Sequence, residues 1–591
     1  MEDTSRTRVC ILLEWKSRDR RIGFIRNINL PGEVGAFVRQ CLFAVWQFPA
    51  SPLPIPSIVS LVGRRRPRRT LTSEMMRSIM TSLPAGVLVL IICSALNVPP
   101  VDGAPRLKPR DSFVVSRDRL AQQEPAFASF EGDIYAGHVP TPQRGGGDGE
   151  LYFMMFDATQ KTFDDALLIW LNGGPGCSSL AGGLFFEMGP VTVPLRPAGY
   201  MGSEKLAPLG PNEHAWTRAS AVMYLEQPAG VGFSTGTAPE SEDDVASDFY
   251  GFLQNFYDIF GDEFRSKRLY IVGESYAGMY VPSMAHKIYL SNNKKNADES
   301  RHVNLAGIGI GNGWMDSKVQ GKAVIDYALW HGMIDPTTRD ALHDQFQVCL
   351  QGGTPKPSPP FHKFNTPDEC GMMGAVLSAA GADALSDGEW SGGPNTYDVT
   401  TWDNYPVLLG RNGTVDNFFN NPEIRKEIHA PINDWKWEQC IPGAGRRRLI
   451  EMDRMLMLDN DKPFSVVPYI SDLLDGADID VLVYNGDRDM SCNSVGSETL
   501  LNEMAWSGQA SWLDPHITKR GLWLVDGKVA GYARAHKGLE FVTVYNSGHL
   551  VPYNVPREVS CTESCTSSFG WLFCQMNDTS LGSSHTLSLS L

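Results

Sequence analysis

The sequence predicts an α/β fold in which helices cover both faces of a mostly parallel sheet. Continuous apolar runs at residues 167–171, 221–225 and 269–272 are typical of strands that are buried on both faces. Residues 244–260, between the second and third runs, carry apolar side chains at helical spacing. Strands that alternate with helices imply parallel pairing through right-handed crossovers.

The bulk composition indicates a globular, acidic protein. Of the 591 residues, 42% are hydrophobic and 10% aromatic, which excludes a disordered chain. Residues 1–74 hold 13 Lys/Arg and 6 Asp/Glu, a charge of +7; since the whole chain carries −15, the remainder carries −22. An acidic body argues against nucleic acid as a partner. Eleven cysteines are enough for a few disulfides.

The first hundred residues have the character of targeting sequence. Residues 1–74 form an atypical basic extension that ends in an arginine cluster. Residues 75–104 have the layout of a signal peptide, with an apolar run at 85–96 and Ala95 or Ala104 as cleavage positions. This run is shorter than the roughly 20 residues of a membrane span. We expect entry into the secretory pathway, towards a vacuole, a lysosome or the exterior; membrane attachment requires that residues 84–98 remain as an anchor.

Further segments complete the predicted fold. A strand pair at 133–139 and 150–156 flanks a glycine-rich turn at 145–149. A helix is expected from 280 to 290, strands at 305–310, 479–484 and 540–544, and a hairpin at 522–525 and 528–532. Residues 319–470, rich in Pro, Gly and Asp, interrupt the alternation as a cap above the sheet. The core is therefore split into 105–318 and 471–556, and residues 557–591 form an atypical Ser/Thr-rich tail.

The stretch around Ser275 indicates a catalytic nucleophile. Residues 273–278 read GESYAG, between a predicted strand and a predicted helix. This is the context of the G-x-S-x-G nucleophile elbow, which exposes a serine hydroxyl above a sheet. The turn also aims the backbone N–H of Tyr276 at the same point.

Other strand ends supply the groups that a serine nucleophile needs. Asp487 and Asp489 follow the strand at 479–484, and His549 follows the strand at 540–544. The chain order Ser…Asp…His is that of the α/β-hydrolase fold. The imidazole takes the serine proton, and either aspartate is placed to orient the imidazole. Consecutive glycines after the strand at 167–171 bring backbone N–H groups close to a reacting carbonyl, as in an oxyanion hole.

Several motifs occur together over residues 125–555: WLNGGPGCSS at 170–179, EMGP at 187–190, QPAGVGFS at 227–234, the elbow, GNG at 311–313, Asp489 with Cys492-Asn493, and GHLVP at 548–552. In these motifs the sequence resembles the serine carboxypeptidases. The resemblance implies Ser275 as nucleophile, His549 as base and Asp489 as the orienting acid. It further implies that the amides of Gly174 and Tyr276 form the oxyanion hole, and that Asn172, Glu187 and Glu274 bind the substrate's C-terminal carboxylate. The implied reaction needs neither cofactor nor metal.

The implied carboxylate site has a physical consequence. A substrate carboxylate beside two glutamates is a cluster of like charges, so it binds only where the glutamates hold protons. We therefore expect raised pKa values for Glu187 and Glu274, peptide hydrolysis that is fastest at acidic pH, and ester hydrolysis that persists at higher pH.

The resemblance also bears on the cysteines. It implies a disulfide between Cys177 and Cys440, and leaves Cys349 and Cys370 as a bridge within the insertion. Cys492 resembles a thiol that lines the substrate pocket, although a small buried apolar role is equally open. A glycosylation sequon at Asn412 fits a secretory route.

The sequence gives opposing indications of which C-terminal residue a substrate should carry. The run from Cys492 to Glu498 resembles the fungal pheromone-processing branch, whose members remove Lys or Arg. However, Leu550 and Ala181 are apolar where an acid could pair with a basic side chain, which favours substrates with hydrophobic C-terminal residues. After Pro556 the family has an amphipathic helix, whereas this chain has no apolar stripe apart from residues 569–573.

The expected partners are the C-termini of peptides or proteins, and the oligomeric state stays open. Two other readings remain: a related acyltransferase that uses the same triad, and a non-catalytic or protective binding protein if the altered tail disables the site.

Overall fold

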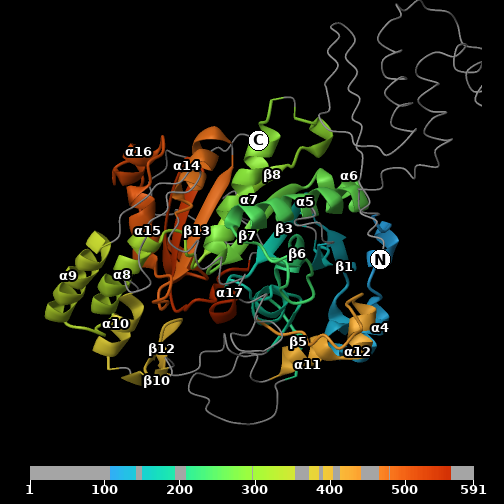
Figure 1. Ribbon diagram of the computed structural model, residues 1–591, viewed down its shortest axis with the longest axis horizontal. Coiled ribbons are helices and arrows are strands. Elements are labelled where there is room, and N and C mark those ends of the chain that lie inside the picture. The colour runs from blue at the N-terminus through green and yellow to red at the C-terminus, as the bar shows by residue number, and fades with distance from the viewer. Residues whose placement is uncertain are drawn as a thin grey trace, which may run out of the picture. The chain divides into compact units, whose positions relative to one another are not determined.

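A ten-stranded mixed sheet organises the part of the chain that the structure describes (Figure 1). The structure is a computed structural model. It describes residues 107–560, apart from 142–148, 161, 194–207, 296, 353–371, 382, 385–389, 403–412, 441–464 and 478. These residues all belong to one compact unit, residues 106–591. In spatial order the strands are β1 (Ile134–Pro140), β2 (Glu150–Phe156), β6 (Ala221–Glu226), β3 (Ala166–Leu171), β7 (Arg268–Glu274), β8 (Leu305–Gly311), β13 (Asp480–Gly486), β16 (Leu539–Val544), β15 (Lys528–His536) and β14 (Gly521–Val525).

The centre of the sheet is parallel and its two edges are antiparallel. The strands from β6 through β3, β7, β8 and β13 to β16 pair in parallel. The β1–β2 and β14–β15 hairpins extend the sheet on either side in antiparallel register. The predicted α/β-hydrolase fold is confirmed, and so are the predicted hairpin and the strand pair.

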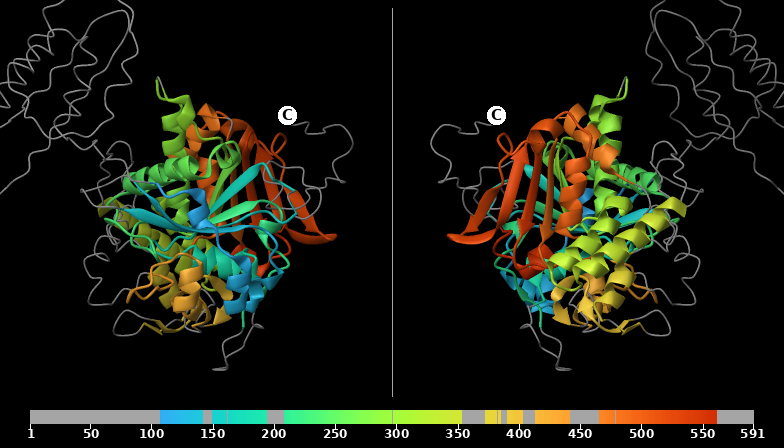
Figure 2. Two further views of the ribbon diagram at one scale, coloured as in Figure 1. Left: turned by 90° about the vertical axis from the view of Figure 1, so that its right-hand side faces the viewer. Right: turned by 90° about the vertical axis from the view of Figure 1, so that its left-hand side faces the viewer.

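Helices pack on both faces of the sheet, as the two views of Figure 2 show. Two clusters of buried apolar side chains lie on opposite faces, because successive residues of each central strand point to opposite sides. One face is covered by α5 (Glu242–Phe260), α6 (Asp262–Arg265), α7 (Ala277–Asn292), α14 (Val467–Gly476), α15 (Ser494–Glu503) and α16 (Gln509–Leu513). The other is covered by α4 (Arg117–Gln123), η2 (Pro125–Ser129), the π-helical η3 (Leu180–Glu187), α11 (Thr414–Asn420), α12 (Pro422–Glu427) and α17 (Val551–Asn554).

One helix begins earlier than the sequence pattern indicates. α7 starts at Ala277, directly after the elbow, and not near residue 280. Its first residues are small because the neighbouring backbone is close: a Cβ on Gly278 would lie 2.6 Å from the carbonyl oxygen of Trp314. Glycine weakens a helical pattern, so the sequence gives no sign of this first turn.

The described part of the insertion consists of helices and short strands. α8 (Ser317–Trp330), α9 (Pro336–Gly352) and α10 (Met372–Ala379) pack together beside α15 (Figure 1). Short strands pair as β4 (Val191–Thr192) with β5 (Gly210–Pro211), β9 (Asp383–Ala384) with β10 (Trp390–Gly392), and β11 (Pro394–Asn395) with β12 (Asp398–Trp402). Three short 3-10 helices are also described: η1 (Arg110–Phe113), η4 (Trp216–Arg218) and η5 (Glu299–Arg301). Among the described residues, no helix is both long enough and apolar enough to cross a bilayer. The segment 84–98 lies outside the described residues.

Candidate active site

The candidate site residues gather at the carboxyl ends of adjacent parallel strands. Asn172 follows β3, Ser275 follows β7, Asp489 comes shortly after β13, and His549 comes shortly after β16. Because these strands are parallel neighbours, their carboxyl ends meet at one edge of the sheet, where open α/β sheets bind ligands. The fold therefore brings residues that are far apart in sequence to one place.

The backbone at Ser275 is in the left-handed region that the elbow requires. Its φ is 63°, which is rare for a residue with a side chain and marks a functional site when the surroundings enforce it. The Ser275 N–H donates to Gly311 O at 3.1 Å. Its carbonyl oxygen accepts from the N–H groups of Gly278 and Trp314, each at 2.9 Å. Hydrogen bonds from β8 and from the loop beyond it therefore hold the turn.

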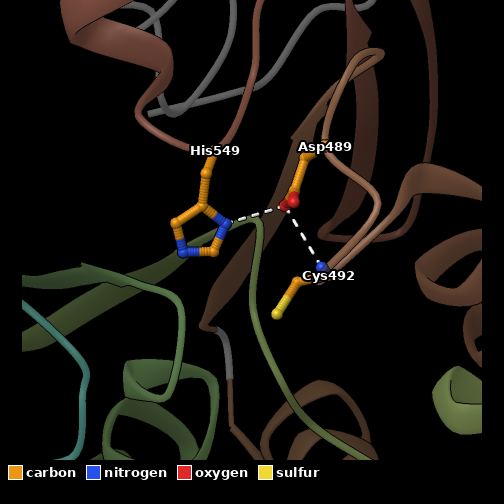
Figure 3. Close-up of side chains that lie close together, drawn as sticks. All are labelled: Asp489, Cys492 and His549. Carbon is orange, nitrogen blue, oxygen red and sulfur yellow. Dashed lines mark hydrogen bonds and ion pairs between the residues drawn. The ribbon is translucent and has the colours of Figure 1, made fainter. Parts of the chain in front are cut away.

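Asp489, and not Asp487, pairs with the histidine (Figure 3). The Oδ2 atom of Asp489 lies 2.7 Å from His549 Nδ1, and the two side chains are 0% and 3% exposed. Asp489 also accepts from the Ser491 N–H at 2.8 Å and the Cys492 N–H at 3.2 Å. Asp487 accepts from the backbone N–H of Ser547 and stabilises the neighbouring loop. Because Asp489 engages Nδ1, the other ring nitrogen of His549 is the one available to exchange a proton with a nucleophile.

Asn312 contacts the candidate orienting acid, and the sequence did not identify it as a candidate site residue. Its Nδ2 donates to Asp489 Oδ2 at 2.7 Å, and its Oδ1 accepts from the Gly486 N–H at 3.0 Å. Asn312 is fully buried with a φ of 41°, a region that Asn tolerates better than most residues. It fixes the orienting carboxylate from β8. The GNG motif is the only sequence signal, and it does not show where the side chain points.

Asn172, Glu187 and Glu274 form a buried polar group beside Ser275. The Asn172 Oδ1 accepts from Trp170 Nε1 at 2.7 Å and from the Gly183 N–H at 3.0 Å. Its amide NH₂ therefore faces Glu274 and donates to Oε1 at 3.0 Å.

The two glutamates of this group share one apolar environment. Glu187 and Glu274 are 2% and 3% exposed. Burial raises the pKa of Glu187 to about 8. Burial, followed by the adjacent Glu187 and Asp489 carboxyls, raises the pKa of Glu274 well above its ordinary value. Protonated carboxyls of this kind can donate hydrogen bonds to an anion.

The glycine loop lies directly against the elbow. A Cβ on Gly173 would overlap the backbone nitrogen of Tyr276, so only glycine permits this approach. Gly174 has a φ of 119°, which also favours glycine. A disulfide joins Cys177 to Cys440, and the Ser178 N–H donates to Gln439 O at 2.8 Å. The loop is therefore attached to the insertion.

A second insertion segment contacts the histidine. The Tyr397 carbonyl oxygen accepts from the His549 N–H at 2.8 Å, and the two rings lie 4.8 Å apart between centroids. Burial raises the pKa of Tyr397 to about 12. Tyr397 had no recognisable signal in the sequence, because it lies between two very short strands.

The remaining candidates lie near the same centre or outside the described residues. Cys492 is 4% exposed, Leu550 4% and Ala181 0%. Among the described residues, one set of potential ligand atoms could hold a metal ion, with the atoms of Asp489, Cys492 and His549 all within 4.8 Å of one another (Figure 3). Within this set of residues, Asp489 and His549 are joined by the 2.7 Å hydrogen bond described above. Cys370 and Asn412 lie outside the described residues, and so does the side chain of Cys349.

The family profile that matches this chain and the relatives described below are carboxypeptidases or carboxypeptidase-like proteins by name. The profile of the serine carboxypeptidase family matches residues 125–563 of the 591. A pheromone-processing carboxypeptidase KEX1 of Meyerozyma guilliermondii is 32% identical over 403 residues, 66% of this chain and 56% of the relative. The serine carboxypeptidase-like 47 protein of Arabidopsis thaliana is 31% identical over 466 residues, 77% of this chain and 82% of the relative.

The crystal structure of Kex1(Δ)p, a prohormone-processing carboxypeptidase from Saccharomyces cerevisiae, superposes with a TM-score of 0.63 at 25% identity. That match covers 76% of this chain and 94% of the crystallised one. The chain spans 56% and 54% of the length of two pheromone-processing relatives, from M. guilliermondii and Candida glabrata. By its profile match, its relatives and its fold, this chain belongs to the serine carboxypeptidase family.

Proposed function

We propose that this protein is a serine-type carboxypeptidase that releases C-terminal amino acids from peptides or proteins through an acyl-enzyme. The observation that carries the proposal is the buried Glu187–Glu274 pair beside Ser275. A serine hydrolase site needs no such pair, whereas a substrate that ends in a carboxylate does. Membership of the family supports the same conclusion.

The proposed reaction begins with proton transfer. His549 takes the proton of the Ser275 hydroxyl as the oxygen attacks the carbonyl of the last peptide bond. The imidazolium that forms is stabilised by Asp489, 2.7 Å from Nδ1. The amides of Gly174 and Tyr276 stabilise the negative oxygen of the tetrahedral intermediate. The histidine then protonates the leaving amine, and water releases the acyl group by the reverse sequence.

In this proposal Asn172, Glu187 and Glu274 select the chain end. Protonated glutamates and the asparagine amide donate hydrogen bonds to the terminal carboxylate, which fixes the scissile bond one residue away. An internal peptide bond has no such carboxylate, so the site acts as an exopeptidase. An acyltransferase would need a site for an alcohol acceptor, and the carboxyl pair does not supply one.

The preferred substrate and the compartment are part of the proposal. We expect the buried, apolar Leu550 and Ala181 to favour hydrophobic C-terminal residues over basic ones, because an apolar pocket cannot compensate a buried cation. Raised carboxyl pKa values suit an acidic environment, such as a vacuole or lysosome, and the exterior is also consistent with entry through the secretory pathway.

The test is a panel of blocked dipeptides and matched esters with the purified full-length chain at acidic pH. We expect hydrolysis that is abolished by Ser275→Ala, together with labelling of Ser275 by an active-site-directed phosphonate. Well-folded protein that neither labels nor hydrolyses would support a binding role instead. Comparable rates on peptides ending in Leu and Arg would refute the proposed preference.

A further inference from the structure

A third buried carboxyl, Glu226, lies near the candidate site and has no part in the reaction proposed above. It is the last residue of β6 and is 0% exposed. Among the described residues it forms no ion pair within 4.0 Å, and it accepts hydrogen bonds instead. A buried carboxyl is retained only where its oxygens are satisfied, which here requires donors from other parts of the chain.

Three donors converge on this carboxyl from three separate segments. Ser178 Oγ donates to Oε1 at 2.6 Å, and Trp437 Nε1 donates to the same oxygen at 2.9 Å. The backbone N–H of Phe233 donates to Oε2. A Cβ on Gly232 would overlap the carboxyl, so the loop before Phe233 needs glycine to wrap around it. Glu226 thus joins the glycine loop, the loop after β6 and the insertion.

The bond from Ser178 is oriented by its neighbours. Ser178 Oγ accepts from the Leu180 N–H at 3.1 Å, so its own proton is directed to Glu226. On the other side, the Cys177 N–H donates to Gly173 O at 3.1 Å. The glycine loop between β3 and η3 is therefore held at its far end by Ser178, next to the Cys177–Cys440 disulfide.

The position of this loop decides the geometry of the candidate oxyanion hole. A Cβ on Gly173 would lie 2.4 Å from the Tyr276 nitrogen, so the glycine loop passes close to the Tyr276 amide. The Gly174 N–H, one residue further, has to converge with the Tyr276 N–H on one oxygen. A displacement of about 1 Å in such a site costs about a hundredfold in rate.

We propose that Glu226 is a positioning residue for the oxyanion hole: through the hydrogen bond from Ser178 it holds the glycine loop, whereas its hydrogen bond from Trp437 connects the end of β6 to the insertion and does not hold the loop. The inference rests on the proposed role of the Gly174 amide. Glu226 touches neither substrate nor Ser275 in this account. Its effect on catalysis passes through the loop.

Among the described residues, few charged or titratable groups lie near Glu226. Tyr152 is the described titratable group that responds to it: burial, and then the Glu226 charge, raises the pKa of Tyr152. The Arg425 guanidinium stacks 5.2 Å from the Phe233 ring and donates to backbone oxygens and to Asn420. The three hydrogen-bond donors therefore stabilise the carboxyl, without a neighbouring cation.

The test compares Ser178→Ala, Glu226→Gln and the control Trp437→Phe on a peptide and a matched ester. Ser178→Ala and Trp437→Phe each remove one donor from the same carboxyl oxygen, but only Ser178→Ala releases the glycine loop. We expect kcat to fall about tenfold or more on both substrates for Ser178→Ala and Glu226→Gln, with KM nearly unchanged. Trp437→Phe should lower Tm and leave kcat within about twofold of the wild type.

Two outcomes would overturn the inference: Ser178→Ala with unchanged kcat, or a fall in kcat that is equal in Trp437→Phe and so follows stability alone. If Glu226→Gln does not fold, the other two variants decide. Glu187→Ala provides the contrast, since it removes the proposed hydrogen-bond donor to the substrate carboxylate, so its loss should be confined to the peptide and appear in KM. Wild-type hydrolysis and its loss in Ser275→Ala test the proposed function separately, so the two failures are distinguishable.

Discussion

The carboxyl pair beside Ser275 makes the alkaline behaviour of peptide binding predictable. In the proposed function, Glu187 and Glu274 bind a substrate carboxylate only while they hold protons. Because burial raises the pKa of Glu187 to about 8, the proton is present throughout the acidic and neutral range and is lost above it. Once Glu187 is ionised, the substrate carboxylate meets a like charge in a buried site.

The magnitude follows from the titration. Above the pKa, each pH unit reduces the protonated fraction about tenfold, which corresponds to about 1.4 kcal/mol of apparent binding free energy. With a pKa of about 8, the protonated fraction falls from about one half at pH 8 to about one eleventh at pH 9, so the KM of a blocked dipeptide should rise about fivefold over this interval. An ester without a terminal carboxylate should show no such rise.

The assay is KM against pH from 5 to 9.5 for a matched peptide and ester. Glu187→Gln keeps a neutral hydrogen-bond donor, so its peptide KM should lose this pH dependence. Glu540→Gln is the matched control: burial also raises the pKa of Glu540, to about 7, but this residue lies at the opposite end of the sheet, near the start of β16. A peptide KM that is flat to pH 9, or an ester KM that rises in parallel, would refute the reasoning.

Three further predictions concern stability and the acid–base pair. Burial raises the pKa of Glu540 from 4.5 to about 7, so its stabilising contribution is complete below pH 4.5 and is lost as pH rises through 7. This loss alone amounts to roughly 3 kcal/mol between pH 4.5 and pH 8, so in urea unfolding the fall in free energy over that range should be smaller by about this amount in Glu540→Gln than in the wild type. Asn312→Ala removes a donor from Asp489 and should lower kcat about tenfold to a hundredfold with little change in KM, measured on the ester; an unchanged kcat would show that Asn312 is dispensable. Replacing Cys177 and Cys440 by Ser opens a link across 263 residues and should cost about 2–5 kcal/mol in chemical denaturation, whereas an unchanged midpoint would contradict a stabilising disulfide.

Much of the fold could be predicted because buried parallel strands have a plain sequence signature. β3, β6 and β7 are continuous apolar runs, and each leads directly into a motif. The elbow was recognisable because its strand, its glycines and its helix occur together. The position of Asp489 and His549 after strands was predicted from the sequence, whereas the pairing of those strands, β13 and β16, is seen only in the structure.

The residues that escaped prediction act across strands or from the insertion. Asn312 contacts Asp489, which comes from a different strand, and the contact depends on the register of β8 against β13. Glu226 ends an apolar strand, and its three donors belong to loops with no periodicity. Tyr397 contacts His549 partly through its backbone carbonyl oxygen. Every residue type has this atom, so the residue type at position 397 does not indicate the contact. Contacts of this kind depend on tertiary packing, on which local patterns carry no information.

Because the candidate site residues are spread along the chain, they are synthesised at different times. Along the chain, the strands whose carboxyl ends carry the candidate site occur in the order β3, β7, β8, β13 and β16. Ser275, which follows β7, is therefore synthesised long before His549, which follows β16. A growing chain emerges from its N-terminus and folds as its segments become available. A nascent chain that has passed Ser275 but not yet His549 contains the nucleophile without the proton acceptor. Under the proposed function, the site can therefore be complete only after β16 and His549 have been synthesised.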